Sequence, residues 1–449
     1  MVLKLHKRTF RGGVHPMQGL HEGKLPTKDK PVREFMPETV CILMGMHLGA
    51  PSKPCVEKGE HVKLGQLIGE PVGALGLPVH ASVSGEVLDV SLKQQMVAEP
   101  AMCVTIKNDY KDEWVDNLKG LGDVETVDPS LIVPAIKAAG ICGMGGACFP
   151  THIKFAMREG QYCDTIILNG AECETYLTSD HRLMLESPEK IVNGLRAAMR
   201  AMGVERGVIA IEDNKPDAIE SMKKAAEGRL GVEVAALKTK YPQGAEKQII
   251  ESITNRQVPR QGLPIDAHVI VLNVGTAAAI SDAISFGRPV VSRITTVTGC
   301  VKSPDNLRLR IGTSFHDAIE ACGGYSETPG KLAAGGSMTG ICVASDEVSM
   351  TKATNGIVVY NLEDAKSFDE GLCIRCGRCV NVCPTGLRPY LMKPYCDAND
   401  LAKAEKYDVM DCIVCGSCSF ICPARLWLTA SFKNTKEKIL LERKRRSGK

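Results

Sequence analysis

A pattern of four cysteines followed by a proline occurs twice near the end of the chain, and it limits how that part can fold. The spacing is Cys-x2-Cys-x2-Cys-x3-Cys-Pro, once over 373–384 and again over 412–423. Three closely spaced thiolates can hold three corners of a cubane cluster, and the fourth cysteine reaches the neighbouring cluster. Zinc knuckles need two Cys-x2-Cys pairs and do not account for the third cysteine, the x3-Cys-Pro ending or the repetition. The repeat therefore predicts two [4Fe–4S] clusters.

The fourth cysteine of each motif binds the cluster of the other motif, and this rule assigns the ligands of each cluster. The predicted sets are Cys373, Cys376, Cys379 and Cys422 for one cluster, and Cys412, Cys415, Cys418 and Cys383 for the other. Gly377 and Gly416 stand where the backbone must turn tightly with its N–H groups directed at sulfide. A purely structural role is an alternative for one cluster, whereas two adjacent clusters indicate electron relay. We interpret the following as ordinary thiols: Cys396, Cys41, Cys55, Cys103, Cys163, Cys300, Cys322 and Cys342.

The chain has 19 cysteines, and so many thiols could indicate either disulfides or metal ligands. Disulfide scaffolds are short secreted domains, whereas this chain has 449 residues and begins without the apolar run of a signal peptide. No uninterrupted apolar stretch reaches the length of about 18 residues that spans a membrane. We therefore expect metal-bound thiols in a reducing cytoplasm. The net charge of +3 is too small to indicate a nucleic-acid partner.

Composition and periodicity divide the chain into several regions. Residues 1–110 are rich in Gly, Pro and Val, and they predict short strands of a β barrel-sandwich. This fold resembles lipoyl and biotinyl carrier domains, but the lysine that those carriers need is absent between Gln66 and Val90. The other regions are an α/β domain over 120–285, a small strand-and-helix module over 286–350, the cysteine-rich domain over 360–432 and a basic tail, helical or disordered, over 433–449. The fold class is thus multidomain α/β.

The α/β region alternates helical and strand patterns. A helix is predicted from the N-cap Asp128 to a stop at Gly140. Continuous apolar runs predict buried parallel strands at 164–170, 206–213 and 269–275, and helical spacing covers 187–203 and 215–228.

A glycine-rich segment follows the first of these helices, over 140–154. It is neither the dinucleotide fingerprint, which needs a preceding strand, nor a phosphate-binding P-loop, which ends in Gly-Lys-Ser/Thr. Its glycines let backbone N–H groups approach an anion or a flat ring, with Lys154 as a counter-charge for phosphate; a packing turn is the alternative. The segments 169–174 and 273–276 follow predicted strands, where α/β folds place ligands, although a solvated loop and a helix cap explain them equally well.

Several motifs carry a resemblance to known families. GMGGACFPTHIK (143–154), NGAECE (169–174) and YPQGAEK (241–247) are similar to segments of the NADH-oxidising flavoprotein subunit of respiratory complex I. More closely, the chain resembles the C subunit of the Rnf electron-transport complex. The matching features run in order from residue 8 to 430 and also include FRGGVHP, HLGAP, LNVGT and the two cysteine motifs.

The resemblance implies an FMN and NADH site in the α/β domain. Gly143, Gly145 and Lys154 would hold FMN on one side, and Asn169, Asn273 and Thr276 would complete its site. NADH would stack on Phe149, with Tyr241, Gly244 and the catalytic candidates Glu174 and Glu246 at its polar parts and Glu172 beside the flavin–nicotinamide pair. The module over 286–350 would be a β-grasp of the soluble-ligand-binding type. Three departures from the complex I pattern alter the expected nucleotide contacts: Met144 for Arg, Ala245 for Glu and Thr175 for Pro.

The same resemblance implies a function and a location. The chain would be the electron-input subunit of a membrane-bound ferredoxin:NAD oxidoreductase that moves Na⁺ or H⁺. It would be peripheral, on the cytoplasmic face of the membrane, with the other Rnf subunits and a ferredoxin-linked iron–sulfur subunit as partners. One alternative is a soluble reductase such as the cobalamin reductase of bacterial microcompartments. Another is an electron conduit with clusters but no flavin.

Overall fold

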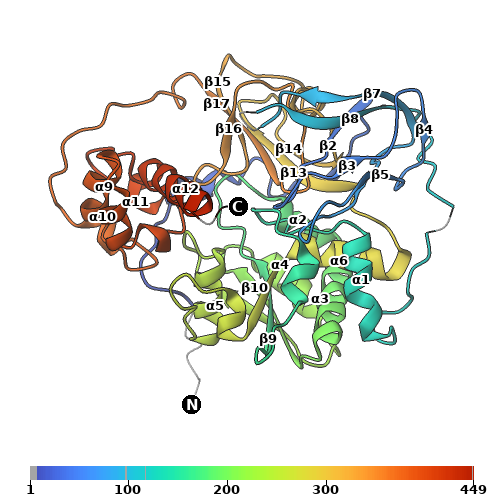
Figure 1. Cartoon of the computed structure of the whole chain (residues 1–449), viewed down its shortest axis with the longest axis horizontal. Coiled ribbons are helices and arrows are strands. Elements are labelled where there is room, and N and C mark those ends of the chain that lie inside the picture. Colours follow the sequence, from blue (N-terminus) through green and yellow to red (C-terminus); the bar gives the residue numbers. More distant parts are fainter. Residues whose placement is uncertain (1–7, 97–98, 117, 447, 449) are drawn as a thin grey trace.

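The computed structural model describes residues 8–96, 99–116, 118–446 and 448. Figure 1 shows the α/β part on one side of two β parts, with the C-terminal helices in red set apart at the end opposite the blue strands β4 and β7. The predicted fold class is confirmed, because each of the four expected kinds of structure is present. The exact domain boundaries stay a prediction.

The first β part consists of two small sheets. One contains, in spatial order, β2 (Thr39–Leu43), β8 (Ala101–Asn108), β7 (Gly85–Lys93) and β4 (His61–Val62); the other contains β3 (Lys53–Pro54), β5 (Leu67–Glu70) and β6 (Val79–His80). Gly85 has φ 146°, and a Cβ there would lie 1.9 Å from the carbonyl oxygen of Lys107. This contact explains why a glycine opens the long strand of the predicted barrel-sandwich.

The α/β part is built on a four-stranded parallel sheet. Its order is β11 (Val232–Leu237), β10 (Arg206–Glu212), β9 (Thr165–Gly170) and β12 (Val269–Asn273). The surrounding helices are α1 (Pro129–Ala138), α2 (Ser179–Glu186), α3 (Pro188–Met202), α4 (Pro216–Ala225), α5 (Glu246–Thr254) and α6 (Val274–Phe286), with the 3₁₀ turns η2 (Thr151–Phe155) and η3 (Pro264–Ala267). The predicted strands and helices of this region are confirmed, including the Asp128 cap, whose side chain accepts from the N–H of Ser130 at 2.9 Å.

The second β part is a six-stranded sheet that draws on distant segments. Its order is β1 (Val32–Glu34), β14 (Asp305–Arg310), β13 (Ser292–Gly299), β17 (Gly356–Asn361), β15 (Pro329–Ala334) and β16 (Ile341–Val343), and α7 (Phe315–Ala321) packs against it. β1 comes from the N-terminal region and β17 follows residue 350, so the sheet includes strands on both sides of the predicted module. Buried side chains such as Ile42 and Val297 belong to one hydrophobic core shared with the barrel-sandwich.

The C-terminal part is a compact group of helices. They are α8 (Arg378–Asn381), α9 (Pro389–Asp397), α10 (Leu401–Lys406), α11 (Ser417–Phe420) and α12 (Leu428–Arg446), with the turn η4 (Val409–Asp411). The basic tail is therefore helical as far as Arg446, and α12 begins before the predicted start of the tail at residue 433. Phe432 and Ile439 of this helix are buried against the cysteine-rich part.

The N-terminal segment before η1 (Gln18–Gly23) joins the α/β part to the C-terminal helices. Val14 pairs with Tyr241, and the N–H of Gly13 donates to the carbonyl of Val382 at 2.8 Å. Gly12 has φ 81°, and a Cβ there would come within 2.9 Å of the carbonyl oxygen of Cys383. The two glycines of the FRGGVHP motif therefore allow this segment to pass between the two parts.

Candidate functional site

The glycine-rich loop lies between α1 and η2, and part of its backbone is free to bind a ligand. The N–H of Gly143 donates to the carbonyl of Phe149 at 2.8 Å, which closes the loop. Gly145 packs against Asn273, where a Cβ would come within 3.1 Å of that side chain. Gly145 and Gly146 are exposed, and among the described residues their N–H groups have no hydrogen-bond partner. Two successive free N–H groups form a concavity that suits an anion.

Lys154 and Asn169 lie at the ends of η2 and β9 and connect this loop to the 241–246 segment. The ammonium of Lys154 donates to the Glu246 carboxylate and to the carbonyl of Val271, each at 2.8 Å. The amide of Asn169 donates to the carbonyl of Gly244 at 2.7 Å. A phosphate bound at Lys154 would therefore share that ammonium with Glu246.

Asn273 and Thr276 belong to the start of α6, directly after β12. The Asn273 side chain caps α6 by accepting from Gly275 at 2.8 Å, and its amide donates to Asp180 at 2.7 Å. The hydroxyl of Thr276 accepts from the N–H of Met144 at 2.9 Å. Since Asn273 pairs in register with Asn169, both amides lie at the carboxyl edge of the parallel sheet, where open α/β sheets bind ligands.

Glu172 is deeply buried in a group of charged side chains. One of its carboxylate oxygens accepts from the N–H of Asp180 at 2.7 Å, and the other has no hydrogen-bond partner among the described residues. The buried Lys24 lies 4.0 Å away and donates to three backbone carbonyls of the same loop, at 2.6–2.9 Å. Burial raises the pKa of Glu172 to about 7, while the charge of Lys24 opposes the rise. Glu172 can therefore hold or release a proton near neutral pH.

Glu174 and Tyr241 lie where three parts of the molecule meet. Glu174 accepts from the N–H of Met338 at 3.1 Å and from the hydroxyl of Thr339 at 2.5 Å. The hydroxyl of Tyr241 is 3.4 Å from the Glu174 carboxylate and donates to the backbone carbonyl of Cys415 at 2.6 Å. Burial raises the pKa of Glu174. Tyr241 thus holds the second cysteine motif against the α/β part, while Glu174 holds the loop between β15 and β16.

The eight motif cysteines gather into the two predicted sets. We call Cys383, Cys412, Cys415 and Cys418 the inner set, and Cys373, Cys376, Cys379 and Cys422 the outer set. The outer set lines one small cavity, and the thiols of the inner set influence one another electrostatically. Burial raises the pKa of Cys379, and the neighbouring thiols of the outer set raise it further. In the inner set, burial and the neighbouring thiols raise the pKa of Cys418 to about 12. Gly377 and Gly416, at φ 75° and 86°, make the predicted tight turns.

The spacing within each set fits a cluster better than a single zinc ion. Zinc–sulfur bonds of about 2.3 Å bring the sulfurs of a tetrahedral site to about 3.8 Å from one another. Among the described residues, His316, Asp346 and Glu347 are the only three metal-ligating side chains whose ligand atoms all lie within 4.8 Å of one another. The motif thiols are therefore more widely spaced than the ligands of one ion.

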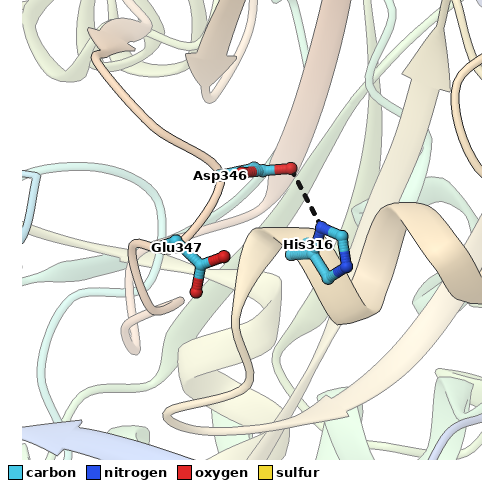
Figure 2. A group of neighbouring side chains, drawn as sticks. All are labelled: His316, Asp346 and Glu347. Carbon is cyan, nitrogen blue, oxygen red and sulfur yellow. Dashed lines mark hydrogen bonds and ion pairs between the residues drawn. The ribbon is translucent and has the colours of Figure 1, made fainter.

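That trio lies on α7 and the loop before Ser349 (Figure 2). His316 Nδ1 lies 3.1 Å from Asp346, and the hydroxyl of Tyr325 donates to the same carboxylate oxygen at 2.8 Å. These bonds connect α7 to the loop, and we interpret them as structural.

Comparison with known families matches most of the chain. The barrel-sandwich part matches the RnfC barrel-sandwich hybrid domain over residues 8–111, and the α/β part matches the complex I 51-kDa FMN-binding domain over 136–282. Residues 294–341 match the SLBB domain, and 366–387 match a 4Fe-4S binding domain.

Characterised relatives cover nearly the whole length. The C subunit of the Na⁺-translocating ferredoxin:NAD⁺ oxidoreductase complex of Acetobacterium woodii is 45% identical, over 97% of this chain and 98% of that protein. The chain belongs to the RnfC family. A second RnfC relative is the C subunit of the proton-translocating ferredoxin:NAD⁺ oxidoreductase complex of Clostridium ljungdahlii, which is 43% identical over 86% of this chain and 84% of that protein. A third is the C subunit of the ion-translocating oxidoreductase complex of Rhodobacter capsulatus, which is 39% identical over 97% of this chain and 84% of that protein.

RnfC membership and the matched domains support FMN and iron–sulfur as the cofactors of this chain. The residues present fit these groups, because the loop offers free N–H groups and an ammonium, and the motifs offer thiols. No helix in the described part of this RnfC chain has both the length and the apolar content to cross a membrane.

Sequence reasoning missed several residues of this RnfC site. The thiols of Cys142 and Cys148 lie 3.2 Å apart, buried at the two ends of the glycine loop. The ammonium groups of the buried Lys24 and Lys215 and the backbone N–H of Asp180 support the Glu172 loop. Nothing in the local sequence distinguishes Lys24 and Lys215 from surface residues, because the carbonyl groups to which they donate lie far away along the chain.

Proposed function

We propose that this chain is the electron-input subunit of a membrane-bound ferredoxin:NAD oxidoreductase complex coupled to translocation of Na⁺ or H⁺. It passes electrons between NADH, FMN, two [4Fe–4S] clusters and a partner subunit. The clusters are held by the inner and outer sets as assigned. Full-length similarity to the C subunits of Na⁺- and proton-translocating complexes supports the assignment.

The α/β part binds and orients the flavin and the nicotinamide. When bound, FMN would supply a group that can accept one hydride, with its two electrons, from NADH and can pass electrons singly to a cluster. Lys154 and the free N–H groups of Gly145 and Gly146 fit its phosphate, while Asn169 and Asn273 face the same sheet edge. Phe149, Gly244 and Glu246 are positioned on the adjoining segments for the nucleotide. Glu172 holds a proton beside this site, because its pKa is raised to about 7.

The single observation that carries the electron path is the hydrogen bond from Tyr241 to Cys415. It fixes the inner set directly against the segment that carries Gly244 and Glu246. The outer set is more exposed: Cys373 and Cys376 are exposed, and so are the side chains of Leu372 and Ile374 on either side of Cys373. Electrons therefore pass from the flavin to the inner set, then to the outer set, and from there to the partner.

The partner is a ferredoxin-linked iron–sulfur subunit or another subunit of the complex, docked on the exposed side of the outer set. Leu372 is 90% exposed and Ile374 is 69% exposed, and apolar side chains of this kind next to a redox centre mark a protein contact. The chain is then peripheral, on the cytoplasmic face of the membrane, and ion translocation belongs to membrane-spanning partners.

The test is anaerobic reconstitution of the chain with iron, sulfide and FMN, followed by titration with NADH. Flavin absorbance reports hydride transfer, and electron paramagnetic resonance reports reduction of each cluster. Bleaching of the flavin together with two reduced-cluster signals supports the proposal. Two clusters without bound flavin and without any response to NADH would leave an electron conduit and overturn the NADH site.

A further inference from the structure

A cavity of about 360 Å³ lies between the α/β part and the six-stranded sheet. Its wall is formed by α2, α6 and the strands β13 and β14, and Met144 of the glycine loop reaches it. None of the residues predicted to hold FMN lines this cavity, although Met144 and Gly275, their neighbours in the sequence, do, so the cavity adjoins the predicted FMN site. Its volume lies within the range of about 300–1,000 Å³ that is typical of small-molecule pockets.

A buried arginine without an acidic partner lines the cavity. Arg293, at the start of β13, is 4% exposed, and its guanidinium donates one hydrogen bond, to the carbonyl of Lys352 at 2.5 Å. Among the described residues no carboxylate lies within 4.0 Å of the Arg293 guanidinium. Asp180, which also lines the wall, attracts it electrostatically from a greater distance, and the Asp180 carboxylate accepts a hydrogen bond from Asn273. A buried charge is costly unless it is paired, and a guanidinium has five N–H donors. Arg293 therefore has donors and charge available for an anion.

A second polar group in the same wall has no partner. Ser179 is 2% exposed, and its hydroxyl has no hydrogen bond within the described part of the chain. It is the first residue of α2, an eight-residue helix, and a helix N-terminus favours negative charge. An anion bound at Arg293 that also reached the Ser179 hydroxyl would satisfy both groups.

The rest of the wall suits an organic body attached to that anion. Val290 and Ile294 are buried, and the exposed Arg288 stacks on Trp114, with its guanidinium 5.1 Å from the ring centre. Arg288 has no ion pair among the described residues, in contrast to the other cations of the wall, which are paired: Lys190 with Asp282, Arg308 with Glu34 and Arg310 with Asp112. The available positive charge is thus Arg293 at the buried end and Arg288 at the exposed end.

We propose that this cavity binds a small organic anion, with its phosphate or carboxylate group held by Arg293 and Ser179 and its apolar part against Val290 and Ile294. The proposal is independent of the electron-transfer function. The occupied cavity would connect α2 and α6 to β13 and so join the α/β part to the six-stranded sheet.

The test is calorimetric titration of the cofactor-loaded chain with phenyl phosphate, benzoate and inorganic phosphate. Phenyl phosphate or benzoate is expected to bind more tightly than inorganic phosphate, because the ring occupies the apolar wall. Arg293→Gln removes the buried charge and is expected to weaken that binding about tenfold or more. Ala279→Leu fills the cavity without changing any charge and is expected to weaken it as well.

The matched control is Arg206→Gln, the same charge change at the opposite end of β10 from the candidate site, which is expected to leave binding unchanged. The proposal is overturned if neither organic anion binds the unaltered chain, or if binding persists in either folded cavity variant. If Arg293→Gln does not fold, Ala279→Leu alone decides between these outcomes.

Discussion

The two cysteine motifs have the same spacing but very different surroundings. Around the inner set, Tyr241 donates to Cys415, Gly13 donates to Val382 next to Cys383, and a Cβ at Gly416 would meet the carbonyl of Met338 at 3.0 Å. Around the outer set, Cys373 and Cys376 are exposed. The motif therefore determines that a cluster can bind, whereas the neighbouring parts of the chain determine whether that cluster faces the flavin region or a partner.

The largest expected effect separates the two sets directly. Cys415→Ala removes an inner ligand, and we expect NADH-driven reduction of an external acceptor to fall by about a hundredfold or more, while flavin reduction continues. Cys376→Ala removes an outer ligand and should leave the inner cluster reducible by NADH. Rapid mixing with NADH, followed by freezing for electron paramagnetic resonance, measures both. Equal reduction of the outer cluster in Cys415→Ala would contradict the proposed order.

Accessibility to a chelator sharpens the same comparison. Because two thiols of the outer set, Cys373 and Cys376, are exposed and none of the four inner thiols is, we expect the outer cluster to lose iron several times faster than the inner cluster. Iron release with an anaerobic chelator, followed in Cys415→Ala and Cys376→Ala protein, assigns each phase to one set. Release at the same rate from both variants would mean that the two sets are equally accessible.

The hydrogen bond of Tyr241 is expected to have a smaller effect. Tyr241→Phe removes the donor to Cys415 and should lower the free energy of unfolding by about 1 kcal/mol. It should also slow reduction of the inner cluster by NADH a few-fold, since the inner set is less firmly held. Tyr110→Phe, the same change at an exposed ring, is the control. If both variants behave alike in denaturation and in NADH mixing, this bond does not hold the inner set.

The remaining expected effect depends on pH and concerns the buried charged groups around Glu172. Burial raises the pKa of Glu172 from 4.5 to about 7, so the folded chain retains a proton that the unfolded chain loses. This contribution to stability is complete below pH 4.5 and is lost as the pH rises to about 7. Glu172→Gln cannot titrate, so the free energy of unfolding should fall less steeply over that window, by roughly 1–3 kcal/mol.

Denaturation of both proteins at several pH values tests this expectation. The buried Asp180 and Glu212 also have raised pKa values and contribute with the same sign, so some pH dependence should remain in the variant. Parallel curves for the two proteins would mean that Glu172 does not titrate in this range.

Local pattern was enough for the elements whose signals lie within a few residues. The apolar run at 164–170 predicted β9, and Asp128 with Gly140 predicted the limits of α1. The six-stranded sheet was only partly predictable, because β1 reaches it from the N-terminal region and pairs with β14. Strand pairing over such distances leaves no periodicity in either segment.

The residues of the candidate site also fall into those that the sequence predicted and those that only the structure revealed. The sequence by itself determined the thiol sets, the glycine loop and the family, because these depend on residue type and spacing along the chain. Only the tertiary structure decided which cysteine set meets Tyr241, that Glu172 is buried beside Lys24, and that Arg293 lines a cavity and has no ion pair in the described part of the chain. Burial, unpaired charge and contact between distant segments are properties of the packed chain, and identical motifs acquire different roles only when other segments cover one of them.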